Sequence, residues 1–293
     1  MNDIDAATPL HQDRAGSQSS GAQGASRASR LDRSQLTMFF VLAFLLSWAG
    51  WPLVLLNPDS SPLVPFGPAF AAVAITALLG RGRVWQLVRQ LTRWRAKLVW
   101  YVVAITGPFA VMGLAGAITV MTGAPAPGVE ILTAWYTLPV TLLSTMVIVG
   151  LFEELGWRGY ALPRLQETHS ALWSALVLGV VWAAWHLPEL VSDPTQQRPP
   201  LPFLVYIVAL SVILTWLYNS TRGSLPVVIA AHAAMNTSAQ FLLPEFAGTH
   251  YLTAFWTMTV LYAGVAAVIA VHIRAERPSS KASDSTRPSA AHR

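Results

Sequence analysis

Apolar residues run along this chain in stretches about 20 residues long, separated by short polar segments. A helix rises 1.5 Å per residue, so about 20 apolar residues cross the ~30 Å hydrocarbon core of a bilayer. The pattern therefore predicts an all-α polytopic membrane protein with about eight transmembrane helices in one domain over 36–273. The expected helices cover 36–56, 62–80, 98–121, 135–153, 171–188, 201–218, 225–243 and 252–273.

The composition agrees with this interpretation. Of the 293 residues, 54% are hydrophobic and only 11% are charged, whereas a soluble domain carries about 25% charged residues. The chain contains no cysteine. A disulfide framework and a cysteine-ligated metal site are therefore excluded.

The basic residues alternate between the two sides of the predicted helices. Of the 19 Lys and Arg residues, only Arg198 falls in a loop on one side. The others lie in the two tails, the loops 81–97 and 219–224, and the segment after Glu154. Because cytoplasmic loops are enriched in Lys and Arg, we expect both termini in the cytoplasm, in a bacterial-type plasma membrane. The net charge of +5 follows from this bias, and no soluble basic domain is present to bind nucleic acid.

Both ends of the chain differ from its centre. Residues 1–35 and 274–293 are too poor in apolar residues to form a core and are expected to be disordered cytoplasmic tails. The segment 81–97 interleaves apolar residues with cations at near-helical spacing. This spacing indicates a helix that lies on the inner headgroups of the bilayer.

Several polar residues lie within or beside the apolar stretches, where a charged side chain costs ~2.5–3.5 kcal/mol on insertion scales and is usually paired or functional. Residues four apart share a helix face. Glu154 can therefore pair with Arg158, which leaves Glu153 without that partner. The full set is Glu153, Glu154, Arg158, His186, His232 and Asn236.

The same spacing of four recurs at two further places. His232 and Asn236 would project into a common space, and the ring of Trp182 can pack against the imidazole of His186. A free carboxylate, two imidazoles and a carboxamide can together activate water and stabilise an oxyanion. Each group alone also has a structural explanation, because a buried histidine can bond a carbonyl and an asparagine can hold helices together. Because all of these groups occur together, a functional site is favoured over separate structural roles.

Three strings carry a family resemblance. EELGWR over 153–158, WAAWH over 182–186 and HAAMN over 232–236 occur in this order on separate predicted helices. They resemble the motifs of the CPBP family of intramembrane proteases, which includes the type II CAAX prenyl endopeptidases and the bacterial Abi proteins. The similarity covers roughly residues 135–240. The family commonly has Phe where this chain has Trp182.

The resemblance implies an endopeptidase that cleaves a peptide or membrane-anchored protein substrate at the lipid bilayer. By this resemblance, Glu153 and His186 activate a water molecule, and His232 and Asn236 stabilise the oxyanion of the tetrahedral intermediate. The residues expected to support them are Glu154, Arg158 and Trp182.

This scheme requires no cofactor. The family is also described as a metalloprotease group, however, and a zinc ion would take Glu153, His186 and His232 as ligands. Both alternatives remain open at this point.

The predicted helix ends create a difficulty. If Glu153 ends one helix, His186 lies about fifteen residues along the next, or ~22 Å away. Three arrangements would shorten this distance: a segment 155–170 sunk in the membrane, a helix that continues past Arg164, or a tilted helix 171–188. A water-filled cavity open to the cytoplasm would then solvate the charges.

Two functions from other classes are also compatible with the polar residues. A non-catalytic membrane scaffold or bacteriocin-immunity protein could use the same cluster for binding. A transporter is disfavoured, because transporters show broken helices at matched positions in two halves, whereas these polar residues all lie in the second half of the chain. The resemblance does not imply prenylated substrates, since nothing in the sequence identifies a lipid-binding pocket.

Overall fold

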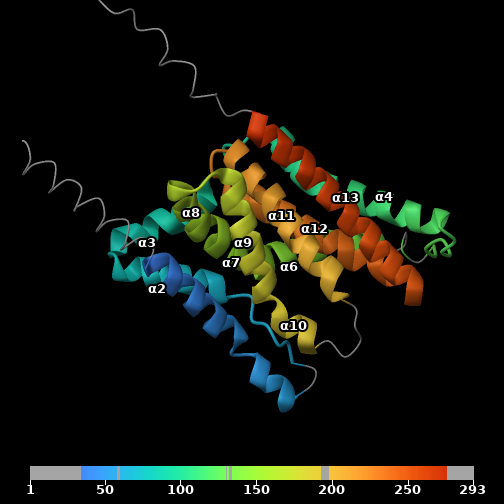
Figure 1. Ribbon diagram of the computed structural model, residues 1–293, viewed down its shortest axis with the longest axis horizontal. Coiled ribbons are helices and arrows are strands. Elements are labelled where there is room, and N and C mark those ends of the chain that lie inside the picture. Colours follow the sequence, from blue (N-terminus) through green and yellow to red (C-terminus); the bar gives the residue numbers. More distant parts are fainter. Residues whose placement is uncertain (1–33, 58–59, 130, 132–133, 193–197, 276–293) are drawn as a thin grey trace, which may run out of the picture.

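The computed structural model describes residues 34–57, 60–129, 131, 134–192 and 198–275. Within these ranges every regular element is a helix, and the helices pack side by side into a bundle (Figure 1). The all-α membrane fold predicted from the apolar stretches is confirmed. The tails 1–33 and 276–293, for which we expect disorder, lie outside the described residues.

Six of the described helical segments are long and apolar enough to cross a bilayer. The other two expected spans fall on α2 (Gly67–Leu78) and α12 (Leu225–Leu242), which do not belong to this group. The number eight therefore stays a prediction. The six segments are Ser34–Val54, Leu98–Met121 (α4), Ala134–Thr168, Ala171–Ser192 (α9, Ala171–Trp185, and α10, Leu187–Ser192), Pro200–Ser220 (α11) and Gly248–Arg274 (in α13, Gly248–Ala275).

The segment Ala134–Thr168 decides the position of the two glutamates. We expected a helix that ends at residue 153, but the helical run continues for 35 residues, about 52 Å at 1.5 Å per residue. Glu153 therefore lies near the middle of the run. This is the second of the three arrangements considered above, in which the helix passes Arg164.

This long run is not uniform. It consists of α6 (Leu138–Thr145), a π-helical turn, α7 (Leu151–Gly156), a second π-helical turn and α8 (Leu162–Thr168). The two π turns, Met146–Gly150 and Trp157–Ala161, directly flank the segment that carries the glutamates. Turns of this kind inside helices occur frequently at functional sites.

Small residues bring the neighbouring helices close. A Cβ atom at Gly156 would lie 2.5 Å from the Cβ atom of Pro68, so α7 and α2 touch through backbone. A Cβ atom at Gly179 would lie 3.0 Å from Ser211, where α9 meets α11. The Ser211 hydroxyl also donates a hydrogen bond of 2.8 Å to the carbonyl of Ala175. Close approach at small residues is the usual packing of membrane helices, and here it sets α7 and α9 in place.

The last helices complete the bundle. α11 packs against both α9 and α13, and α12 packs against α4 and against the π turn that precedes α7. In Figure 1, α11 accordingly lies between α9 and α13. This arrangement brings α7, α9 and α12, which carry the polar residues singled out from the sequence, around one space.

The basic segment 81–97 folds as α3 (Arg81–Val88) and the 3-10 turn Arg89–Thr92, so the expected helix is present. The segment is attached to the bundle by side chains. The Gln90 amide donates to the carbonyl of Gly159 at 3.0 Å, and the Ser224 hydroxyl donates to the carbonyl of Arg93 at 2.7 Å. Its contact with lipid headgroups stays a prediction.

Candidate active site

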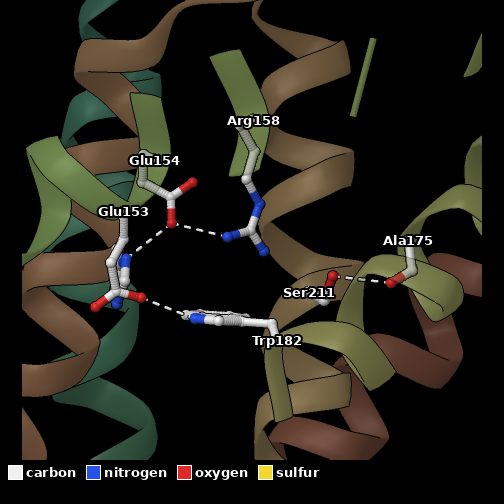
Figure 2. A network of polar contacts seen from close by, with 7 residues as sticks. Glu153, Glu154, Arg158, Ala175, Trp182 and Ser211 are labelled. Atoms are coloured by element: carbon white, nitrogen blue, oxygen red, sulfur yellow. Dashed lines mark hydrogen bonds and ion pairs between the residues drawn. The ribbon is translucent and has the colours of Figure 1, made fainter. Parts of the chain in front are cut away.

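The two adjacent glutamates of α7 are both buried, with exposed fractions of 3% for Glu153 and 0% for Glu154. They point in different directions and contact different partners, as Figure 2 shows. The helical offset of about 100° between neighbouring residues, which follows from 3.6 residues per turn, is the cause of this separation.

Glu154 binds two partners through one oxygen. Its Oε1 accepts a hydrogen bond from Nη1 of Arg158 at 2.8 Å, and Nδ1 of His232 lies 2.8 Å from the same oxygen. All three side chains are buried. The Glu154–Arg158 pair expected from helical spacing is therefore present. The contact with His232 was not predicted, because helical spacing relates residues of one helix only.

Glu153 has one hydrogen-bond partner among the residues described. Its Oε2 accepts a hydrogen bond of 2.8 Å from the indole Nε1 of Trp182 (Figure 2). Its other oxygen has no hydrogen-bond partner within the described part of the chain, and the residue lines a cavity. One carboxylate oxygen is thus held by protein while the other faces the cavity.

Trp182 connects the whole cluster. The Arg158 guanidinium lies 4.6 Å above the centroid of its ring, a cation–π contact. The rings of His232 and His186 lie 5.2 Å and 5.8 Å away. Packing against His186 was expected, but the hydrogen bond to Glu153 was missed. The available signal was that a buried indole N–H usually finds an acceptor.

His186 directly follows the last residue of α9. Its Nδ1 lies 2.8 Å from the carbonyl oxygen of Trp182. Because a carbonyl only accepts, Nδ1 carries the hydrogen, and the neutral ring has its lone pair on Nε2. The rings of Trp185 and Phe203 lie 4.8 Å and 5.3 Å away. These contacts fix the orientation of the imidazole.

A cavity of about 880 Å³ joins the residues proposed from the sequence as reacting groups, since Glu153, His186, His232 and Asn236 all line it. Glu154 and Arg158 do not line it. The division between reacting and supporting residues thus coincides with a spatial division between the cavity wall and the layer behind it. Much of the remaining wall is apolar, formed by Phe203, Tyr206, Ile207, Leu210, Phe255 and Met258.

A metal would need a group of at least three suitable ligands. Over the residues that the structure describes, no such group of His, Asp or Glu side chains is found. Nδ1 of His232 already contacts Glu154, and Nδ1 of His186 contacts the carbonyl of Trp182, so each ring has only Nε2 left. Zinc binding stays a prediction, and the scheme proposed below uses no metal.

Comparison with known proteins relates part of this chain to a protease family. Residues 135–238 match the family of Rce1-like type II CAAX prenyl endopeptidases. A CAAX prenyl protease 2 from Methanococcus maripaludis is 30% identical over 111 residues. Over residues 135–238 this chain is therefore similar to the CAAX protease family. The match with the archaeal relative covers 35% of this chain and 41% of the relative, so less than half of that protein's length is spanned.

The matched segment 135–238 includes every polar site residue singled out from the sequence. It begins at the start of the long helical run and ends two residues after Asn236. The N-terminal span, α2, α4 and α13 lie outside it. Parts of the cavity wall, such as Phe255 and Met258 of α13, therefore come from regions outside the family match.

Proposed function

We propose that this protein is an endopeptidase that hydrolyses a peptide bond of a membrane-associated substrate inside the cavity. One observation carries the proposal: Glu153, His186, His232 and Asn236, from three helices, line the same cavity. A non-catalytic scaffold has no need to place four such groups around one cavity. An enzyme that hydrolyses amides needs a base, hydrogen-bond donors and a place for the substrate.

Water activation falls to Glu153 and His186. The Glu153 oxygen that is not bonded to Trp182 accepts a proton from the attacking water, while Nε2 of His186 accepts the hydrogen bond of the second water proton. The hydroxide oxygen then bonds to the scissile carbonyl carbon. The electron pair of the carbonyl double bond moves to its oxygen, which becomes the oxyanion.

Stabilisation of that oxyanion falls to His232 and Asn236. Asn236 donates an amide hydrogen, and Nε2 is the ring nitrogen of His232 that is left for the oxyanion, since Nδ1 of this ring lies 2.8 Å from Oε1 of Glu154. The contact with Glu154 holds the His232 ring in this orientation. When the intermediate collapses, the C–N bond breaks and Glu153 returns its proton to the leaving amine, which gives one carboxylic acid and one amine.

The apolar wall indicates which part of the substrate lies there. Phe203, Ile207 and Phe255 face the cavity that contains the reacting groups. We propose that they contact apolar side chains of a peptide segment near the membrane, because removing apolar surface from water is favourable.

The test is cleavage of an unbiased peptide library by the protein purified in detergent, followed by mass spectrometry. The matched control is Glu153→Gln, which preserves the size of the side chain and the acceptor for Trp182. We expect defined cleavage products with the parent protein only. Equal product patterns from both proteins would refute the peptidase and favour a scaffold that uses the same residues for binding.

A further inference from the structure

The wall of the cavity comes from one end of each surrounding helix. α9 and α10 contribute Trp182 to Glu189, near their common C-terminal end, and α11 contributes residues from Phe203 to Leu210, near its N-terminal end. α12 contributes residues from His232 onward and α13 contributes residues up to Met258. These helix ends all adjoin the loops that precede α2, α11 and α13.

Exposed residues of the wall lie on the same side. Ser61, Arg198, Gln240 and Ala247 line the cavity and are exposed. The hydrogen bond of 2.8 Å from Trp51 to Ser192 ties two of the chain segments on this side together. The cavity thus reaches the surface at the face of these loops, which we call the cavity face.

The arginines gather on the opposite face. Arg89, Arg93, Arg95 and Arg222 line a separate depression of about 700 Å³, with no Asp or Glu among the residues that line it in the described chain. Ser224 holds this region together through its bond to Arg93. α12 begins beside Ser224 and runs past His232 to Leu242, so it connects this arginine face to the cavity face.

The two faces carry different charge. Among the described residues that line the active-site cavity there is one Arg and no Lys. Nη1 of this residue, Arg198, lies 3.7 Å from the Glu189 carboxylate. Arg158 is buried beside Glu154. The remaining Lys and Arg residues lie in the tails, in the segment 81–97, at Arg164 and at Arg222. Because Lys and Arg accumulate on the cytoplasmic side of a membrane protein, the arginine face is the cytoplasmic one.

We propose that the cavity opens on the outer, non-cytoplasmic face and that the protein takes its substrate there. That the bound molecule is a substrate rests on the proposed function, whereas the direction of the opening does not. The substrate class is a peptide segment on the outer side of the membrane, with apolar residues that fit the cavity wall. A lipid-modified tail on the cytoplasmic side would have to cross the bilayer to reach Glu153. This proposal differs from the cytoplasmic opening expected from the sequence.

Cysteine labelling tests this proposal without any measurement of activity. The chain contains no cysteine, so each introduced cysteine is the only thiol. Ala247→Cys places it at the rim of the cavity, and Gln86→Cys places it on the exposed arginine face. Right-side-out spheroplasts that express each variant are treated with a membrane-impermeant maleimide, before and after permeabilisation.

We expect Ala247→Cys to be labelled in intact spheroplasts and Gln86→Cys to be labelled only after permeabilisation. The reverse pattern would overturn the proposal, and so would labelling of both or of neither in intact spheroplasts. Gln240→Cys lies on the same face as Ala247→Cys and replaces it in the test if Ala247→Cys does not fold.

A second measurement separates this proposal from the proposed function. A peptide that the detergent-purified protein cleaves is added outside the spheroplasts, and its cleavage is measured. Spheroplasts that express Glu153→Gln give the background cleavage. Labelling from outside without cleavage in detergent would refute the peptidase but not the direction of the opening. Cleavage in detergent together with labelling from the cytoplasmic side would refute the direction but not the peptidase.

Discussion

Replacing Glu154 with Gln should destabilise the protein, because one buried oxygen serves both Arg158 and His232. Removing one member of a buried ion pair costs about 3–5 kcal/mol, since the other charge remains buried. Gln still offers an acceptor oxygen, so we expect about 3 kcal/mol. At about 2–4 °C per kcal/mol for a domain of this size, the apparent Tm should fall by about 6–12 °C.

The double variant makes the reasoning testable. Arg158→Met alone should also destabilise the protein, because the Glu154 charge then loses its cation. In the double variant neither charge of this pair remains, and replacing a whole buried pair by neutral groups is often nearly neutral. We therefore expect the double variant to be more stable than additivity predicts by about 2–3 kcal/mol, the upper range for residues in contact.

The assay is thermal unfolding of the four proteins in one detergent, followed by tryptophan fluorescence. Glu167→Gln is the matched control, because Glu167 lies in α8 of the same helical run but is exposed. It should change the free energy of unfolding by less than about 0.5 kcal/mol. Additive losses in the double variant would show that Glu154 and Arg158 do not stabilise each other as a pair.

Three further outcomes are expected. Asn236→Ala should lower kcat by ~10²–10³ with little change in KM, because a lost oxyanion donor acts in the transition state; equal losses in kcat and in substrate affinity would point to a binding role. Gly156→Ala should reduce the yield of folded protein, because its Cβ would lie 2.5 Å from Pro68. The control Gly264→Ala has no atom within 4 Å of its Cβ and should be neutral or stabilise α13 slightly. Equal yields of the two variants would refute the close contact. Peptide cleavage should persist in a metal chelator, and a loss that zinc restores would instead favour a metal site.

The sequence predicted contacts within one helix well and contacts between helices poorly. Spacing of four residues predicted the Glu154–Arg158 pair, which the structure contains. The bonds from Trp182 to Glu153 and from His232 to Glu154 join residues 29 and 78 positions apart. No periodicity relates such positions, so these bonds could be found only once the helices were placed against one another.

Hydropathy also misplaced one helix end. Two glutamates and an arginine lower the hydropathy after residue 152, which resembles the end of a membrane span. In the structure these charges are buried and Glu154 is paired with Arg158, and paired charges are tolerated inside a membrane domain. The helical run therefore continues to Thr168. The side on which the cavity opens cannot be predicted from hydropathy for a related reason, since it depends on which helix ends meet around the cavity.

The central claim is that Glu153, and not Glu154, activates the attacking water, and the rate of peptide cleavage in two isosteric variants tests it most directly. Glu153→Gln and Glu154→Gln would be compared with the parent protein under single-turnover conditions, with folded protein quantified by gel filtration. We predict that Glu153→Gln is folded and without measurable cleavage, while folded Glu154→Gln retains partial activity. A folded Glu153→Gln that cleaves peptide, beside a folded and inactive Glu154→Gln, would contradict the account.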